Sequence, residues 1–275
     1  MLTGAGGQLG TDLQQAFWSD DLHALAKADL DVTDRNAVEK AVDQISPEVI
    51  VNAAAITDVD SCETETDRAW AANALAVRHL AEAADRAGAR LVHFSTDYVF
   101  DGTARQPYTE WDPPNPQSMY GRSKLGGEHE LRPGDLCIRA SWLVGEHGHN
   151  ILKTVLRLAA DGQTLRFVDD QRGSPSFARD VADLTRRLVD LGATGIYHGA
   201  NQGSVSWYEY VGDVLEAAGR SRTQVEAIST AELQPPRPAP RPAYSVLDGA
   251  ALRVGGLEPQ PHYLDSLRDL VARLT

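Results

Sequence analysis

Short apolar runs alternate with amphipathic stretches along the first half of the chain. The apolar runs have the length of strands, whereas the stretches between them carry apolar residues at helical spacing. Strands separated by helices pair in parallel through crossover connections. The pattern therefore predicts an α/β fold with a Rossmann-type doubly wound parallel sheet. The predicted strands are Leu22–Ala26, Val49–Asn52, Arg90–Ser95 and Leu136–Ala140, and the predicted helices are Gln8–Phe17, Asn36–Ile45, Asp67–Ala87 and Tyr120–Glu130.

The regular alternation of apolar runs and amphipathic stretches ends after Ala140. The segment Gln234–Pro242 holds five prolines, which exclude regular structure there. We expect a dinucleotide-binding Rossmann domain over 1–145, to which 176–200 returns, and a smaller C-terminal substrate-binding lobe made of 146–175 and 201–275. The elements predicted in this half are the helices Asn150–Ala160, Phe177–Asp190, Ser206–Ala218 and His262–Leu274 and the strands Leu165–Val168 and Ile196–His198.

Composition and charge narrow the class of protein. The chain has 275 residues, 42 % apolar and 24 % charged, as in a globular protein with a substantial core. Its net charge of −13 argues against nucleic acid or an anionic membrane as a partner. No apolar run approaches the roughly 18–20 residues of a membrane span, and nothing resembles a signal peptide. Two cysteines, Cys62 and Cys137, are too few for a disulfide framework. We expect a cytoplasmic acidic enzyme or binding protein.

Three glycines at three-residue spacing stand near the start of the chain. Gly4, Gly7 and Gly10 would let backbone N–H groups approach a pyrophosphate at the N-terminus of a helix. A glycine-rich turn without a ligand explains the spacing equally well. Two features favour a nucleotide, because the strand Val49–Asn52 ends in small residues and an Asp-Val pair follows the second strand. The candidates for cofactor binding are Gly4, Gly7, Asp31, Val32, Ala53, Ala54 and Ala55.

The end of the second predicted strand bears on the choice of cofactor. An acidic side chain there binds a ribose 2′-hydroxyl and repels a 2′-phosphate. The stretch Leu25-Ala26-Lys27-Ala28 has no acid and one cation. Lys27 is therefore a candidate cofactor contact and favours NADPH over NADH, although a solvated surface lysine accounts for it equally well.

Tyr120 and Lys124 lie four residues apart in a predicted helix, so both side chains share one face. Tyrosine ionises near pH 10, too high for easy proton exchange at neutral pH. A lysine one turn away favours the phenolate, lowers its pKa and can also hold a cofactor ribose. Such a pair alone is a weak indicator. Here it follows Ser95-Thr96-Asp97 at the end of a strand, in a chain with a glycine loop, and this combination is specific.

These motifs together resemble the extended short-chain dehydrogenase/reductases, and among them the dTDP-4-dehydrorhamnose reductases. The glycine loop, the small residues after Asn52, the run Ser95–Phe100 and the tyrosine–lysine pair carry the resemblance. Two later stretches, Asp170–Pro175 and Arg241–Ser245, look like later motifs of that family. The resemblance covers essentially the whole chain.

The resemblance implies roles for single residues. Tyr120 would be the proton donor, Thr96 the hydroxyl that orients the keto group, and Lys124 the partner of Tyr120. Trp142 also fits a core position, and Asp97 also fits a turn cap. The implied cofactor contacts are Gly7, Gln8, Leu9, Asp31, Val32, Ala55, Ile56, Thr57, Tyr120 and Lys124. The implied sugar site consists of Val59, Thr96, Asp97, Tyr98 and Trp142.

The function implied by the resemblance is NAD(P)H-dependent reduction of the C4 keto group of dTDP-4-dehydro-6-deoxy-L-mannose to dTDP-L-rhamnose. Another sugar-nucleotide dehydrogenase or epimerase is one alternative. Dehydration is disfavoured, because the residue after Asp97 is Tyr98 rather than the second carboxylate of dehydratases. A non-catalytic subunit, like the regulatory partner of methionine adenosyltransferase, is another alternative. Intact Thr96, Tyr120 and Lys124 favour an enzyme.

A dTDP-sugar substrate requires local cations in so acidic a chain. Arg241 is the candidate beside the diphosphate, and a surface arginine in a proline-rich loop is the alternative. Some relatives are dimers bridged by Mg²⁺, but no carboxylates of this chain can be assigned to such a site. The choice between monomer and homodimer therefore stays open.

The predicted first strand is short. Only Met1, Leu2 and Thr3 precede Gly4, whereas a Rossmann first strand has about five or six residues. About three missing buried apolar residues, at ~1.5–3 kcal/mol each, would cost roughly 5–9 kcal/mol. Whole domains are stable by only ~5–15 kcal/mol. We therefore expect the natural product to begin several residues upstream.

Overall fold

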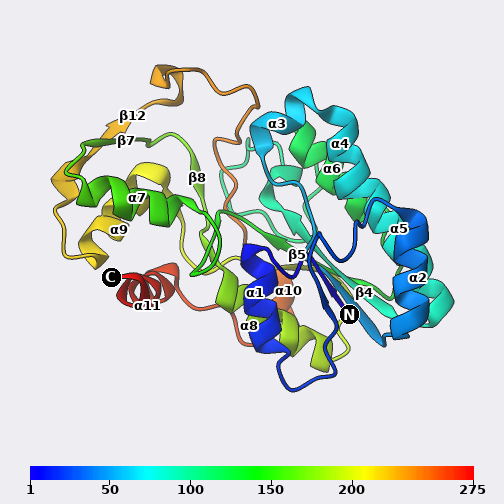
Figure 1. The fold of residues 1–275 in the computed structure, drawn as a ribbon. Coiled ribbons are helices and arrows are strands. Elements are labelled where there is room, and N and C mark those ends of the chain that lie inside the picture. The colour runs from blue at the N-terminus through cyan, green and yellow to red at the C-terminus, as the bar shows by residue number, and fades with distance from the viewer.

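A parallel sheet of six strands forms the centre of the molecule, a computed structural model that describes residues 1–275 (Figure 1). The strand order is β10-β5-β4-β3-β1-β2, and every neighbouring pair is parallel. The chain changes direction between β1 and β3, which makes this the switch point where nucleotides bind in such sheets. The predicted doubly wound fold is confirmed. The bounds are β1 Leu2–Thr3, β2 Ala24–Leu25, β3 Val49–Asn52, β4 Arg90–Thr96, β5 Leu136–Ala140 and β10 Gly195–His198.

The central strand β1 is short but fully paired. Leu2 lies between Ala24 of β2 and Val51 of β3, and only 1 % of it is exposed. The Met1 ammonium donates to the Val49 carbonyl oxygen at 2.9 Å. The strand thus leads directly from the amino end of the sheet into the glycine loop.

Helices cover both faces of the sheet. Three pack on one face, where they share a core of 16 buried residues with β1, β4 and β5. The other face is covered by three more helices, two of which close a second core around Val38, Leu80 and Ile50. The first group is α1 Gln8–Ala16, α8 Ala178–Asp190 and α10 Ala250–Val254, and the second is α2 Arg35–Ile45, α5 Ala76–Ala87 and α6 Met119–Glu128.

The later part of the chain builds a smaller lobe beside the sheet (Figure 1). It has its own core of 16 buried residues, closed by a parallel pair of strands, β7 and β12. None of the helices in the structure has the length and apolar character to cross a membrane. The lobe's elements are α7 Ile151–Ala160, β7 Leu165–Val168, α9 Trp207–Ala217, β12 Val225–Ile228 and α11 Tyr263–Leu274.

Short strand pairs join this lobe to the sheet. These are β6 with β9 and β8 with β11, each strand being two residues long, at Leu143–Val144, Ser176–Phe177, Arg172–Gly173 and Val205–Ser206. One segment inside 201–275 packs on the sheet instead of the lobe, because α10 contacts β10 and buries Leu252 in the first core.

One predicted helix is interrupted. The stretch expected as a helix over Asp67–Ala87 consists of α4 Thr66–Trp70, a π-helical turn at Ala71–Leu75, and α5. A further helix, α3 Val59–Thr64, precedes it. Asn73 of the π-turn is buried. Its side-chain oxygen accepts from the Ile56 amide at 2.9 Å, and its side-chain nitrogen donates to the Ile56 carbonyl oxygen at 3.0 Å. The widened turn therefore fixes the loop that follows β3.

Candidate active site

A cavity of about 650 Å³ opens at the carboxyl ends of β1, β2 and β3. Nine of the predicted cofactor contacts line it, namely Gly4, Gly7, Lys27, Asp31, Val32, Ala53, Ala54, Ala55 and Ile56. The remaining wall includes Arg68, Ala71 and Ala72 of α4 and the π-turn, which the sequence analysis does not single out. The glycine loop and the small residues after β3 thus form one cavity.

The glycine loop has the shape expected for approach to a phosphate. Gly4 has φ +69°, and a Cβ there would lie 2.6 Å from the Ala53 carbonyl carbon. A Cβ on Gly10 would collide with the Gly4 carbonyl oxygen. Helix α1 begins at Gln8 with no side-chain cap, so its first N–H groups are free to bind an anion. The backbone of this loop therefore leaves no room for a side chain at Gly4 or Gly10.

Five predicted cofactor residues lie outside the cavity wall, namely Gln8, Leu9, Thr57, Tyr120 and Lys124. Leu9 is buried in the core, which leaves its backbone N–H as the group it can offer. Gln8 donates to the Leu143 carbonyl oxygen at 3.1 Å and accepts from Asn150 at 2.7 Å, so it joins α1 to the later lobe. Thr57 is exposed beyond the cavity.

Two cations stand at the rim of the cavity. Lys27 is exposed, and Arg68 is half-exposed and pairs with Glu65. The nearby carboxylate of Asp31 accepts from the Thr33 amide and hydroxyl at 2.9 and 2.7 Å, and these bonds lower the pKa of Asp31. The rim therefore holds two cations, of which Arg68 is already paired, together with the ionised carboxylate of Asp31.

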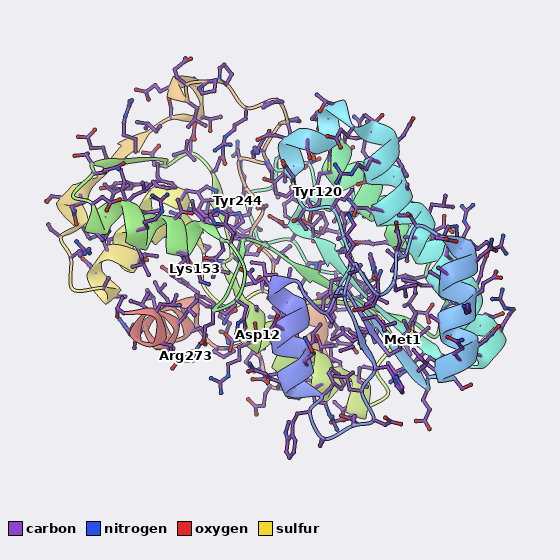
Figure 2. The ribbon with its side chains drawn as sticks, in the orientation of Figure 1. Met1, Asp12, Tyr120, Lys153, Tyr244 and Arg273 are labelled. Atoms are coloured by element: carbon purple, nitrogen blue, oxygen red, sulfur yellow. The ribbon has the colours of Figure 1, made fainter.

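Thr96 and Tyr120 meet at the carboxyl ends of the strands, opposite Met1 at the amino ends (Figure 2). Thr96 ends β4, and Tyr120 lies in the first turn of α6, which Ser118 caps. Helix α6 approaches the loop after β4 so closely that a Cβ on Gly121 would collide with the Tyr98 carbonyl oxygen. This glycine lets the phenol come close to the Thr96 hydroxyl, which itself donates to Asp97 Oδ1 at 3.0 Å.

The side chains around the Tyr120 ring come from the predicted cofactor and sugar sites. Ile56, Val59 and Tyr98 pack against the small cluster of Cys62, Ala69 and Tyr120. The Tyr98 and Tyr120 rings meet edge to face at 5.5 Å. The structure thus brings these predicted residues together around the phenol.

Lys124 bonds to groups other than Tyr120. Burial raises the pKa of Tyr120, and the Thr96 hydroxyl offsets this in part. The Lys124 Nζ instead donates to the Phe94 carbonyl oxygen at 2.6 Å, and burial lowers its pKa to about 8. Tyr120 and Lys124 both lie on the buried face of α6, as their spacing predicts, but the long lysine side chain turns toward β4.

Asp97 is a buried carboxyl at the same strand end. Burial raises its pKa to about 6, against the hydrogen bonds of Ser245 and Thr96, which lower it. Its Oδ2 atom has no hydrogen-bond partner in the protein. The atom therefore keeps an unused capacity to accept a hydrogen bond.

The family model of the RmlD substrate binding domain matches residues 1–275. The chain belongs to this family.

Similar proteins agree with that membership. The spore coat polysaccharide biosynthesis protein SpsK of Bacillus subtilis is 40 % identical over 276 residues, 98 % of this chain and 95 % of that protein. The dTDP-4-dehydrorhamnose reductase of Mycobacterium tuberculosis is 39 % identical over 283 residues, 99 % of this chain and 92 % of that one. The crystal structure of dTDP-4-dehydrorhamnose reductase from Bacillus anthracis in complex with NADP has a TM-score of 0.95 at 35 % identity, covering 99 % of this chain and 98 % of that chain.

In this RmlD-family chain, Trp142 has an unusual backbone conformation. Its φ is +48°, a region that bulky residues rarely occupy and that clusters at functional sites. Its indole stacks on Trp207 with ring centroids 3.7 Å apart, and a Cβ on Gly173 would lie 2.7 Å from it. Trp142 packs against the core of the smaller lobe, so the lobe holds the strained residue in place.

The two later family motifs pair with each other. Arg172 donates its N–H to Ala243 at 2.8 Å, and Ser245 returns a bond to Arg172 at 2.8 Å. Ser245 then reaches Asp97. The motifs, which are far apart in sequence, therefore connect the smaller lobe to the end of β4.

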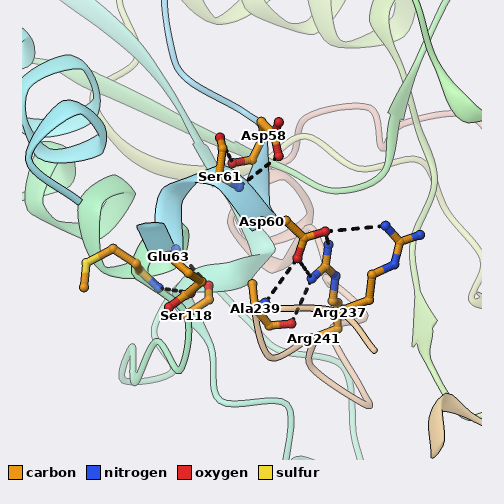
Figure 3. A network of polar contacts seen from close by, with 10 residues as sticks. Asp58, Asp60, Ser61, Glu63, Ser118, Arg237, Ala239 and Arg241 are labelled. Carbon is orange, nitrogen blue, oxygen red and sulfur yellow. Dashed lines mark hydrogen bonds and ion pairs between the residues drawn. The ribbon is translucent and has the colours of Figure 1, made fainter. Parts of the chain in front are cut away.

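Arg241 is not a solvated surface side chain. Only 15 % of it is exposed, and it forms two bonds to Asp60 of α3, one of them at 2.8 Å (Figure 3). Arg237 lies 3.4 Å from the same carboxylate, and the Ala239 amide donates to it at 3.1 Å. The proline-rich segment is thus tied to the helix that begins at Val59.

Several residues of this site escaped the sequence analysis. Trp207, Asp60, Asn73 and Arg68 each reach the site from an element that carries no motif. The only local signal is the N-cap position of Ser206 before Trp207, which marks a helix start but not a neighbour of Trp142.

Proposed function

We propose that this chain is an NADPH-dependent reductase of the C4 keto group of dTDP-4-dehydro-6-deoxy-L-mannose, giving dTDP-L-rhamnose, with NADH as the alternative cofactor. The observation that carries the proposal is the meeting of Thr96 and Tyr120 beside a cavity lined by a glycine loop. Membership of a family whose named relatives include dTDP-4-dehydrorhamnose reductases supports it.

The residues fit a dinucleotide. The uncapped start of α1 and the glycine cradle would hold the pyrophosphate, since a Cβ at Gly4 would fill that space. Lys27 and Arg68 would face a 2′-phosphate and offset the charge of Asp31, whose carboxylate is engaged with Thr33. When bound, the nicotinamide supplies the hydride.

Tyr120 then gives its proton to the substrate oxygen that was the C4 keto group. Burial keeps the phenol protonated, which is the form a general acid needs. Thr96, which lies beside Tyr120, would hold the keto oxygen in line with the phenol. Asp97, with one free oxygen, would bind a sugar hydroxyl, and Lys124 would hold the cofactor ribose.

The remaining substrate contacts come from both parts of the chain. Trp142, stacked on Trp207, and the Val59 and Tyr98 side chains would line the sugar. Two guanidinium groups share one Asp60 carboxylate, which leaves positive charge for the diphosphate at Arg241 and Arg237. We propose that the sheet binds the cofactor and that the smaller lobe binds the sugar nucleotide. This lobe consists of residues 146–175 and 201–275 without α10.

The test measures NADPH oxidation with and without the keto-sugar nucleotide, and identifies the product by NMR. Oxidation that depends on the keto sugar and yields dTDP-L-rhamnose supports the proposal. An epimerase would interconvert sugar nucleotides without net NADPH consumption, and a regulatory subunit would bind NADPH without turnover. Light scattering on the same protein distinguishes the monomer from the homodimer.

A further inference from the structure

A line of buried polar side chains runs behind the catalytic pair. It starts at Thr3 of β1 and passes through Asn52 of β3 and His93 of β4 to Lys124 of α6, and each of the four is at most 3 % exposed. The successive distances are 2.7 Å from Thr3 Oγ1 to Asn52 Oδ1, 3.2 Å from Asn52 Nδ2 to His93 Nδ1, and 3.4 Å from His93 Nε2 to Lys124 Nζ. No residue of this line except Lys124 enters the mechanism above.

The backbone fixes the direction of the hydrogen bonds along this line. The Ala54 N–H can only donate, and it donates to Asn52 Oδ1 at 3.2 Å. The amide nitrogen of Asn52 must then face His93, and it too can only donate. His93 Nδ1 therefore accepts, so the neutral ring carries its proton on Nε2.

That proton points at the lysine. An ammonium has three donors and no lone pair, so it cannot accept from His93 Nε2–H. A neutral amine can accept this bond and still donate to the Phe94 carbonyl oxygen at 2.6 Å. The hydrogen-bond pattern around Lys124 is therefore complete only when Lys124 is uncharged.

The remaining neighbours of Lys124 raise its pKa less than burial lowers it. Cys137 of β5 is buried, and burial holds the pKa of its thiol well above the usual range. Glu128, on the same helix as Lys124, is held by Arg139 through two bonds of 2.9 and 2.7 Å. A Cβ on Gly127 would lie 3.3 Å from His93 Nε2, so the helix closes over the ring. Burial also lowers the pKa of His93 far below its ordinary value.

We propose that His93 is a positioning residue that weakens proton binding at Lys124 in the cofactor-free protein, and that at mildly alkaline pH, where Lys124 is then a neutral amine, it takes up one proton from solvent when the nicotinamide cofactor binds. The second half of this proposal rests on the proposed function. The step forms one N–H bond on Nζ with a proton from water and moves no other electrons. The new ammonium is repelled by His93 Nε2–H, which turns it away from β4 and toward the catalytic site.

The chain has four lysines, Lys27, Lys40, Lys124 and Lys153, so lysine labelled with ¹³C at Cε gives a spectrum that can be read residue by residue. Lys124→Met identifies the Lys124 signal by its disappearance. In the cofactor-free protein we expect this signal to titrate roughly two pH units below those of the exposed Lys27 and Lys40. Titration of Lys124 together with these exposed lysines would overturn the proposal.

His93→Gln tests the role of the ring directly. Its amide oxygen can accept from an ammonium, so the Lys124 titration should move up by about one pH unit or more. His93→Phe keeps a ring of similar size but has no donor, and should raise the titration by less. The matched control is His198→Gln, another buried histidine whose Nδ1 lies 3.0 Å from the Asp248 carbonyl oxygen, and it should leave Lys124 unchanged. If Lys124 titrates at the same pH in both His93 variants as in the wild type, the positioning role of His93 is contradicted.

Saturating NADPH tests the proton uptake. The Lys124 signal should then stay in its charged form up to the pH at which the exposed lysines titrate. If NADPH binds and the Lys124 titration stays in place, the proton-uptake half is wrong. If NADPH does not bind at all, the proposed function fails, whereas the cofactor-free titrations still decide whether His93 weakens proton binding at Lys124.

Discussion

Burial keeps the Tyr120 phenol protonated at neutral pH, because it raises the pKa of Tyr120 and only the Thr96 hydroxyl offsets it. Tyr120→Phe removes the proton donor and leaves the packing around the ring intact. General acid catalysis contributes roughly 10²–10⁴-fold, so kcat should fall by about that factor with NADPH affinity unchanged. Steady-state kinetics and NADPH titration measure the two quantities.

The matched control for this variant is Tyr210→Phe. Tyr210 is buried in the smaller lobe, and its hydroxyl has no hydrogen-bond partner. Its loss should leave kcat unchanged. A Tyr120→Phe enzyme that keeps more than half of the wild-type activity would remove Tyr120 from the proton-donor role.

Asp97 makes the stability of the fold depend on pH. Burial raises the pKa of this carboxyl from 3.8 to about 6. Between about pH 4 and 6 the folded protein keeps a proton that the unfolded chain has lost, so stability falls as pH rises through this window. Relative to Asp97→Asn, the wild type should lose roughly 2 kcal/mol between these limits. Urea unfolding at several pH values measures the difference, and parallel curves for the two proteins would show that Asp97 does not titrate there.

Residues whose chemistry needs a fixed sequence spacing could be predicted, and residues that only meet in space could not. Thr96 and Tyr120 stand in motifs, and the structure brings them together. Trp207 reaches Trp142 from a distant helix, and Asp60 meets Arg241 across 181 positions. His93 reads as an interior strand residue until its neighbours on β3 and α6 are known.

At the scale of elements, the contact of α1 with the glycine loop decides whether the cofactor cavity forms. Gly10→Ala places a Cβ against the Gly4 carbonyl oxygen, so either the helix or the loop must move. We expect a loss of about 1–3 kcal/mol in the free energy of unfolding, together with weaker NADPH binding. Gly134→Ala is the control, since no atom lies within 4 Å of the added carbon. Equal behaviour of the two variants in thermal melts and NADPH titrations would contradict the close packing.

The proline-rich segment carries the second prediction at this scale. Arg241→Ala removes a guanidinium proposed for the diphosphate, so KM for the sugar nucleotide should rise about tenfold or more, with KM for NADPH unchanged. Asp60→Asn breaks the same ion pair but keeps the Arg241 charge, and should raise KM less. Arg253→Ala, an exposed arginine paired with Asp248, is the control. Equal KM values for the Arg241→Ala and Asp60→Asn enzymes would mean that the ion pair acts only by holding the segment.

Long amphipathic helices and buried strands could be read from their periodicity, as α1, α2, β3 and β5 show. The two-residue strands β6, β8, β9 and β11 carry no period at all, because tertiary contacts alone define them. The helix predicted over Asp67–Ala87 contains a π-turn, which leaves the apolar pattern nearly unchanged while it moves Asn73 onto Ile56. Periodicity reports which face is buried, not where one extra residue is inserted.

At the scale of the molecule, the sheet and the smaller lobe meet at the reacting groups. The cofactor cavity lies at the switch point of the sheet, and the paired later motifs link the lobe to Asp97 through Ser245. A hydride donor held on the sheet and a sugar held by the lobe would thus converge beside Tyr120. The central claim is that hydride reaches C4 of the sugar while Tyr120 protonates its oxygen.

Transfer of isotope from the cofactor tests this claim most directly. The enzyme is supplied with NADPH that carries deuterium at both C4 positions of the nicotinamide, together with the keto-sugar nucleotide, and the sugar product is examined by NMR. We predict one deuterium at C4 of the product sugar in wild type, and the same position of label at a much lower rate in Tyr120→Phe. A product with hydrogen at C4, or with deuterium at any other carbon, would contradict direct hydride transfer to the C4 keto group.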